Sequence, residues 1–275
     1  MRIDLHVHSN ASDGTDAPAE VVRRAAEAGL DVMALTDHDT QAGLASARAA
    51  LPDGLTLVPG MELSCLLDGR SVHLLAYLFD PDDATLKAET AQIRDDRAYR
   101  AKAMVEKARE LGADVTWDQV AAIADGAVIG RPHIARALAA AGAVATPADA
   151  FTADWIADDG RAFVGRYAVD LARGVSLVRA AGGVTVLAHP RSPGYEIPDE
   201  VIVALAHAGL CGIEVFHLDH DQEERARLTE LAKSLGLLTT GGSDDHGSFN
   251  NRGLGAETTP PEEYELLLTL AGTRP

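Results

Sequence analysis

The sequence predicts an α/β protein with a mostly parallel sheet or barrel, interrupted once by a helical insertion. Seven short apolar runs alternate with helical patterns, which is typical of repeated βα units. The strand signal then disappears between residues 87 and 166, where consecutive helical patterns take its place. A length of 275 residues with 47% hydrophobic residues is enough for one sizeable core.

The expected strands are short and rich in Val, Ile, Leu and Thr. They lie at residues 2–6, 31–36, 55–60, 71–79, 184–189, 211–216 and 237–242. Helices are expected at residues 18–28, 41–50, 170–181, 199–207, 222–235 and 261–271. Pro18 suits the first turn of the first helix, and Gly29 suits the position directly after its end. Strands that alternate with helices in this way favour a parallel arrangement.

The segment between Lys87 and Arg166 is a compositional unit of its own. Its helical patterns cover residues 86–111, 117–124 and 132–141. It carries 11 Lys and Arg against 12 Asp and Glu, a net charge of -1, whereas the rest of the chain carries -17. No Pro-rich linker borders it. We therefore predict a barrel formed by residues 1–86 and 167–275, with residues 87–166 as a helical subdomain packed onto it.

Composition excludes several classes of protein. Cys65 and Cys211 are 146 positions apart and belong to no CxxC pair, which excludes a disulfide framework and a thiolate zinc site. The N-terminal residues lack a leader pattern, and no run reaches the roughly 18 apolar residues that span a bilayer, so we expect a cytoplasmic protein. The net charge of -18 disfavours long nucleic acids and anionic membranes as partners.

Side chains that commonly bind metals gather where the expected strands end. His6 and His8 alternate with apolar residues, so both imidazoles lie on one face of the first strand. Further candidates are Asp13, His38, Glu62, His73, His189, Asp244 and His246. The C-terminal ends of parallel strands meet on one face of a barrel, where these groups would converge. Imidazole and carboxylate ligands without thiolate suit Mn, Fe or Zn.

Five short motifs carry a resemblance to a known family. DLHVHS, TDHD, GMELS, AHP and GSDDHG occur in this order between Met1 and Asn250. This succession resembles the polymerase and histidinol phosphatase (PHP) family of metal-dependent phosphoesterases. The resemblance implies a distorted (β/α)7 TIM-like barrel, in agreement with the seven expected strands. The insertion motif at residues 130–136, GRPHIAR, is similar to that of stand-alone members that act on nucleotides or short RNA.

The resemblance also implies a trinuclear site with two to three divalent ions, of which Mn is expected first and Fe or Zn are alternatives. The implied ligands are His6, His8, Glu62 and Asp244 for one ion, Glu62 with His73 and His189 for a second, and Asp13, His38 and His246 for a third. Some relatives have His where Asp13 stands, which leaves the metal of the third site open. Glu62 and Asp244 are predicted to be catalytic, because they would hold ions that share an attacking hydroxide.

Candidates for substrate recognition lie in the insertion and after the sixth strand. Arg131 and His133 open a helix whose N-terminus favours an anion, with a structural helix start as the equal alternative. Arg166, at the end of the insertion, is a further candidate. His217 is predicted to bind substrate and His220 to transfer a proton, with solvated loop histidines as the alternative.

Two further groups receive an expected role. Three arginines repeat on one helix face in the insertion: Arg94, Arg97 and Arg100. The favoured interpretation is a solvated face paired with Asp95 and Asp96. Four aspartates flank expected ligands and are predicted to orient them: Asp4, Asp37, Asp39 and Asp245.

The predicted function is hydrolysis of a phosphomonoester of a small nucleotide, either a nucleoside 5′-monophosphate or a 3′,5′-bisphosphonucleotide. One alternative is 5′-3′ exoribonuclease activity on short 5′-phosphorylated RNA, and another is histidinol phosphate phosphatase activity. The negative net charge favours a small substrate over RNA. A non-catalytic metal-binding regulatory module is disfavoured, because every implied ligand is present in the sequence.

Overall fold

The computed structural model describes residues 1–192 and 196–272. In this part of the chain, eight strands form one sheet with the path β1-β2-β3-β4-β6-β7-β8, and β5 pairs with β3 at the side. The strands are β1 (Ile3–Val7), β2 (Val32–Leu35), β3 (Thr56–Leu67), β4 (Arg70–Tyr77), β5 (Val169–Asp170), β6 (Val184–Leu187), β7 (Gly212–Phe216) and β8 (Leu238–Gly241). The seven strands of the path coincide with the seven expected strands, and the two-residue β5 was not expected.

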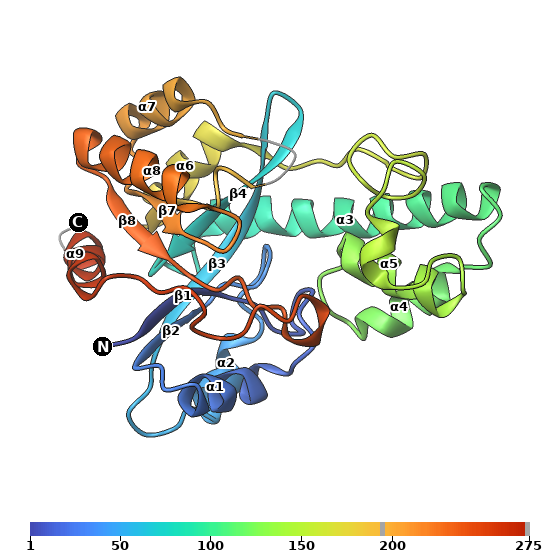
Figure 1. Cartoon of the computed structure of the whole chain (residues 1–275), viewed down its shortest axis with the longest axis horizontal. Coiled ribbons are helices and arrows are strands. Elements are labelled where there is room, and N and C mark those ends of the chain that lie inside the picture. Colours follow the sequence, from blue (N-terminus) through green and yellow to red (C-terminus); the bar gives the residue numbers. More distant parts are fainter. Residues whose placement is uncertain (193–195, 273–275) are drawn as a thin grey trace.

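The sheet curls until its first and last strands approach each other. Beyond the end of β8, Val7 forms a parallel bridge with Asp245. The backbone N–H of Asp244 donates to the carbonyl of His6 at 2.8 Å, and that of His8 donates to Asp245 at 3.0 Å. The sheet is therefore a nearly closed barrel, which confirms the predicted fold class (Figure 1).

Strand β4 is the exception in the mostly parallel sheet that was expected, because it runs antiparallel to both β3 and β6. β3 continues to Leu67, well beyond the end expected near Glu62, and the chain reverses at Asp68 and Gly69. The φ angles of these two residues are 50° and 79°, as a tight hairpin turn requires. The reversal brings His73 opposite Ser64, so His73 reaches the site from the first half of its strand.

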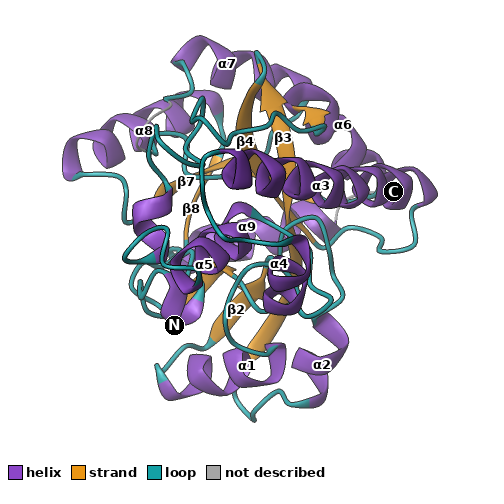
Figure 2. Ribbon diagram, turned by 90° about the vertical axis from the view of Figure 1, so that its right-hand side faces the viewer, coloured by secondary structure: helices purple, strands orange, loops and turns teal. Residues whose placement is uncertain are grey.

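Helices surround the barrel and bury the outer faces of its strands (Figures 1 and 2). They are α1 (Pro18–Glu27), α2 (Leu44–Ala49), α6 (Leu171–Ala180), α7 (Asp199–Ala208), α8 (Gln222–Leu235) and α9 (Pro261–Gly272). Helix α2 begins three residues later than expected, after Gly43 as its N-cap. Among the described residues, no helix combines the length and apolarity that crossing a bilayer would need.

The insertion is helical, as predicted, and has a core of its own. It contains α3 (Ala84–Glu110), α4 (Trp117–Ala124), α5 (Arg131–Ala140) and the short 3-10 helix η1 (Pro147–Ala150). Met104 and Val105 of α3 pack with Ile134 and Leu138 in that core. The first turns of α3 instead pack into the barrel, where Ile93 is fully buried. Helix α3 thus joins the two parts and places α4 and α5 beside the barrel (Figure 1).

Candidate metal centre and adjoining pocket

Glu62 lies at the centre of the histidine cluster, with a side chain that is only 1% exposed. Five imidazoles surround its carboxylate. Its Oε1 lies 2.8 Å from His73 Nδ1 and 3.1 Å from His189 Nε2, while its Oε2 lies 3.3 Å from His6 Nε2, 3.1 Å from His8 Nε2 and 3.1 Å from His38 Nδ1. Because each oxygen faces a different group of histidines, this carboxylate is arranged as a bridge.

The other eight metal-ligand candidates from the sequence gather in one cluster with Glu62. Three sets of their ligand atoms lie within 4.8 Å of one another: His6, His8, Glu62 and Asp244; His38, Glu62 and His73; and His8, Asp13, His38 and His246. The first set is identical to the first group implied by the resemblance, and the third set contains the third group. His189 joins the second group through its contact with Glu62.

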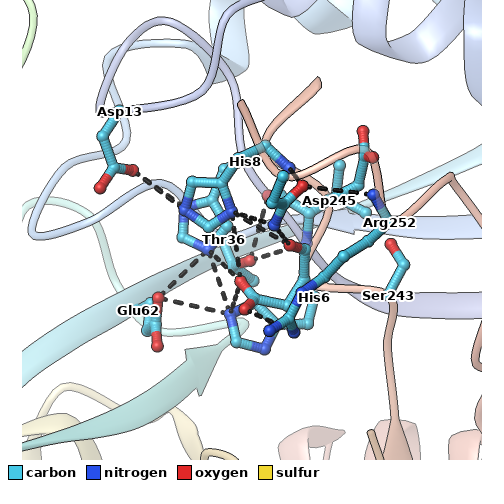
Figure 3. A network of polar contacts seen from close by, with 12 residues as sticks. His6, His8, Asp13, Thr36, Glu62, Ser243, Asp245 and Arg252 are labelled. Atoms are coloured by element: carbon cyan, nitrogen blue, oxygen red, sulfur yellow. Dashed lines mark hydrogen bonds and ion pairs between the residues drawn. The ribbon is translucent and has the colours of Figure 1, made fainter. Parts of the chain in front are cut away.

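Several buried atoms of these sets lie near other ligand candidates but make no hydrogen bond of good geometry with a described residue. They are His8 Nδ1, His38 Nδ1 and Asp13 Oδ1. A buried polar atom without a partner costs about 1 to 3 kcal/mol, and a bound cation would satisfy the lone pairs of all three. The donor set therefore fits divalent metal ions. In Figure 3, Asp13 and Glu62 approach His8 from the same side.

Four members of the cluster, Glu62, Asp244, His38 and His73, have protonation states that suit metal binding. Burial alone would raise the pKa of the Glu62 and Asp244 carboxyls, but the surrounding histidines hold both pKa values well below their usual range. Burial also lowers the pKa of His38 to about 3 and lowers that of His73, which favours neutral imidazoles. Ionised carboxylates and neutral imidazoles are the forms that coordinate metals. Burial alone would lower the pKa values of His6, His8 and His189, but the neighbouring carboxylates raise all three above the usual value, so a metal ion would have to displace their protons.

The aspartates that flank the ligands hold the backbone of the ligand-bearing segments. Asp37 accepts hydrogen bonds from the backbone N–H of Ser9 at 2.8 Å and from the Ser12 hydroxyl at 2.7 Å. Asp4 accepts from the backbone N–H groups of Ser243 and Gly255, at 3.0 and 2.8 Å. Asp39 and Asp245 likewise accept from backbone N–H groups, those of Ser64 and Gly253. These aspartates would therefore orient the ligand candidates through backbone contacts.

A cavity of about 360 Å³ adjoins the cluster and extends beneath the insertion. On the barrel side it is lined by Asp13, His38 and His73. The other walls include three aromatic rings, Phe151, Phe163 and Phe249, and two carboxylates, Asp158 and Asp159. Five arginines also line the cavity: the exposed Arg70, and four that are more buried and are called the arginine group, Arg97, Arg100, Arg131 and Arg166. One continuous space thus connects the metal-ligand candidates to a group of cations.

The expectation of a solvated arginine face was wrong for Arg97 and Arg100. They are only 6% and 7% exposed, because helix α3 turns this face toward the barrel and the cavity. Arg97 Nε donates to Asp39 Oδ2 at 2.7 Å and its Nη2 donates to the Ser64 hydroxyl at 2.6 Å. Arg100 Nε donates to the carbonyl of Val164 at 2.6 Å. In the sequence, the i, i+3 spacing of Arg97 and Arg100 indicated that they share one helix face, but not that this face is buried.

Arg131 and Arg166, predicted from the sequence, complete the arginine group. Arg166 donates to the hydroxyls of Ser64 and Ser71, at 2.8 and 2.6 Å, and Arg131 donates to Asp158 at 2.6 Å. Burial, together with the neighbouring arginines, lowers the pKa of both Arg100 and Arg166 to about 9. Such crowding of cations favours the binding of an anion in the cavity.

The three remaining histidine candidates lie outside the cavity lining. His133 accepts the backbone N–H of Gly130 at 3.0 Å and so caps helix α5. His217 accepts a hydrogen bond from Arg252 at 2.7 Å and lies 3.6 Å from Asp244 Oδ2, which places it behind that ligand candidate. His220 is engaged on both ring nitrogens by backbone groups, the carbonyl of Val215 and the N–H of Arg191. These contacts favour supporting roles over direct substrate binding or proton transfer.

Two supporting residues at the cluster were not identified from the sequence. Glu214 lies 2.9 Å from His6 Nδ1, and Arg252 donates to Asp244 Oδ2 at 3.1 Å. Burial opposes ionisation of Glu214, but His6 and other nearby histidines lower its pKa to about 2. The only available signal for Glu214 was a single carboxylate inside the apolar run at residues 211–216.

Comparison with known proteins identifies related chains over nearly the whole length. A 5′-3′ exoribonuclease of Haemophilus influenzae is 34% identical over 253 residues, covering 89% of this chain and 90% of the relative. A 3′,5′-nucleoside bisphosphate phosphatase of Chromobacterium violaceum is 33% identical, covering 89% and 87%. A crystal structure of a proposed metal-dependent phosphoesterase from Bifidobacterium adolescentis superimposes with a TM-score of 0.93 at 37% identity, covering 98% and 96%.

The family assignment follows from these matches and from the site. The PHP domain family model matches residues 4–92, which contain His6, His8, Asp13, His38, Glu62 and His73. The full-length relatives extend the similarity through the second half of the barrel. The chain belongs to the PHP domain family.

Proposed function

We propose that this chain is a metal-dependent phosphoesterase that hydrolyses a phosphomonoester of a small nucleotide, with 3′,5′-bisphosphonucleotides as the preferred class and nucleoside 5′-monophosphates as the next. The observation that carries the proposal is the cavity that connects one edge of the metal-ligand cluster, at Asp13, His38 and His73, to the arginine group. Membership of the family makes the chain a hydrolase of phosphoric esters. The arginine group adds a place for a second anionic group of the substrate.

The chain's own residues would divide the work along the cavity. Glu62 and the surrounding histidines would hold two to three divalent ions, with Mn expected first. When bound, such ions polarise phosphoryl oxygens and make water a better nucleophile at neutral pH. Arg97 and Arg166 are held beside His73 by the Ser64 hydroxyl, so they would orient the substrate next to the cluster.

The arginine group supports a substrate with two phosphates. A phosphate carries close to two negative charges at neutral pH and accepts hydrogen bonds on several oxygens, which matches guanidinium donors. Phe151, Phe163 and Phe249 border the same cavity and would contact an apolar or aromatic part of the substrate. A nucleotide with two phosphates would place one at the metal-ligand cluster and the other at the arginine group, so it would use both ends of the cavity.

The proposal is tested by comparing kcat/KM, with Mn supplied, for 3′,5′-bisphosphoadenosine, AMP, histidinol phosphate and a short 5′-phosphorylated RNA. We expect phosphate release from the bisphosphate to be at least about tenfold more efficient than from AMP, because one extra charge-assisted contact contributes roughly 1.5 to 3 kcal/mol. Preference for the RNA would instead support the exoribonuclease alternative, which the Haemophilus influenzae relative favours. Preference for histidinol phosphate, or no hydrolysis at all, would contradict the proposal.

Arg131→Ala is expected to lower kcat/KM for the bisphosphate by about tenfold to a hundredfold, through loss of a charge-assisted contact. The effect on a minimal aryl phosphate should be much smaller, because that substrate has no group to reach the arginines. Arg136→Ala provides the matched control, since Arg136 lies on the same helix α5 outside the cavity lining. Equal losses for both substrates would place Arg131 at the transferred phosphate, and no loss would make it structural.

A further inference from the structure

Glu214 is a buried carboxylate on the inner side of the barrel. It lies on β7 between Ile213 and Val215, which are fully buried in the apolar core outside the sheet. Side chains alternate along a strand, so Glu214 projects to the opposite face, toward the histidine cluster. The residue is fully buried, and a carboxylate in this position is stable only when its oxygens have partners.

Both carboxylate oxygens of Glu214 contact metal-ligand candidates from other strands. Oε1 lies 2.9 Å from Nδ1 of His6, which comes from β1. Oε2 accepts the backbone N–H of His189, directly after β6, at 2.9 Å. The two imidazoles are stacked, with their centroids 5.8 Å apart and an angle of 14° between the rings. One carboxylate therefore links two ligand candidates that lie on separate strands.

The contact with His6 selects the tautomer of that ring. Nδ1 must carry the proton to donate to Glu214, so Nε2 keeps its lone pair. Nε2 is the nitrogen that faces Glu62 and Asp244, at 3.3 and 3.4 Å. The hydrogen bond thus directs the lone pair of His6 into the proposed metal site, as carboxylate partners of metal-binding histidines do.

The contact with His189 stabilises an unusual backbone conformation. The φ angle of His189 is 26°, on the positive side that residues other than glycine rarely occupy. The hydrogen bond from its N–H to Glu214 holds the backbone there, and the ring then reaches Glu62 Oε1 at 3.1 Å. Glu214 therefore acts on a side chain of the first ligand group and on the backbone of the second.

We infer that Glu214 is a positioning residue that sets the geometry of two metal-binding groups at once, through the ring of His6 and the backbone of His189. This inference rests on the proposed metal-dependent function. It concerns metal binding and not the identity of the ester that is hydrolysed.

Glu214→Gln tests the inference, because glutamine has the same shape but only one acceptor oxygen. Its amide can satisfy either the His6 N–H or the His189 N–H, and its NH2 group then opposes the other donor. We expect the free Mn concentration for half-occupancy, measured by dialysis and elemental analysis, to rise by about tenfold to a hundredfold. Nitrogen NMR of the metal-free chain at alkaline pH, where no cation fixes the tautomer, should show that His6 no longer holds its proton uniformly on Nδ1.

Glu89→Gln is the matched control. Glu89 is also a buried carboxylate with two side-chain partners, Tyr167 and Arg173, but it lies outside the cluster. Its Mn occupancy curve should equal that of the wild type. If Glu214→Gln fails to fold, Glu214→Asp decides, because the shorter side chain cannot reach both partners and should weaken Mn binding measurably.

Wild-type Mn binding and an unchanged His6 tautomer in the folded Glu214 variant would overturn the inference. This outcome is independent of the substrate panel. A wild-type chain that binds Mn, yet hydrolyses none of the four esters, would contradict the proposed function and leave the role of Glu214 intact.

Discussion

Glu62→Gln is expected to lower kcat by at least about 1,000-fold, which corresponds to about 4 kcal/mol of lost transition-state stabilisation. Five imidazoles face the two oxygens of this carboxylate. Glutamine replaces the negative charge by a neutral amide with a single acceptor oxygen, so it cannot bridge two ion sites. The fold should be preserved, because the two side chains have nearly the same shape.

Steady-state kinetics on the best substrate of the panel, together with circular dichroism, would measure this effect. Glu257→Gln is a suitable control, since Glu257 pairs with Arg225 away from the cluster and its loss should leave kcat unchanged. Activity of the Glu62 variant within a few fold of the wild type would show that this carboxylate is not the bridge.

Arg97→Leu is expected to lower the free energy of unfolding by about 3 to 5 kcal/mol, the usual cost of leaving one partner of a buried ion pair alone. Arg97 and Asp39 have side chains that are 6% and 0% exposed and lie 2.7 Å apart. The same guanidinium donates to Ser64 on β3, so it connects helix α3 to the barrel. Urea denaturation followed by circular dichroism would measure the change.

Two further variants separate the ion pair from general packing. Adding Asp39→Asn should restore part of the stability of Arg97→Leu, because the unpaired charge is then removed. Arg94→Ala removes a hydrogen bond to the Asp39 carbonyl from the same helix and should cost only about 1 kcal/mol. A loss below about 1 kcal/mol for Arg97→Leu would mean that solvent reaches Asp39 and that the pair contributes little.

The barrel could be predicted from the sequence because its signals are local. Each strand has its own apolar run, and the alternation of His6 and His8 with apolar residues shows that they share a face. The reversal at Asp68 and Gly69 was missed, although Asp-Gly is a common hairpin turn. An apolar run predicts a buried strand but not its direction, so residues 71–79 could not show that β4 is antiparallel to its neighbours.

The sequence identified those residues of the candidate site whose side-chain chemistry is unusual at strand ends, and missed those whose role depends on burial. Nine ligand candidates stand out because imidazoles and carboxylates at strand ends are poorly explained by packing. Arg97 and Arg100 could not be separated from a solvated helix face, since their burial depends on where α3 lies against the barrel. His217 and His220 were predicted in functional roles because they follow the sixth expected strand. Their partners, the Arg252 side chain and the Arg191 backbone N–H, could not be identified from the sequence.

Counting metal ions tests the central claim most directly. Elemental analysis of the full-length chain, purified and equilibrated with Mn, should find two to three transition-metal ions per chain, because the cluster contains three overlapping sets of ligand atoms, two of which include Glu62. Retention of no more than one ion per chain under these conditions would contradict the claim that this cluster is a multinuclear metal centre.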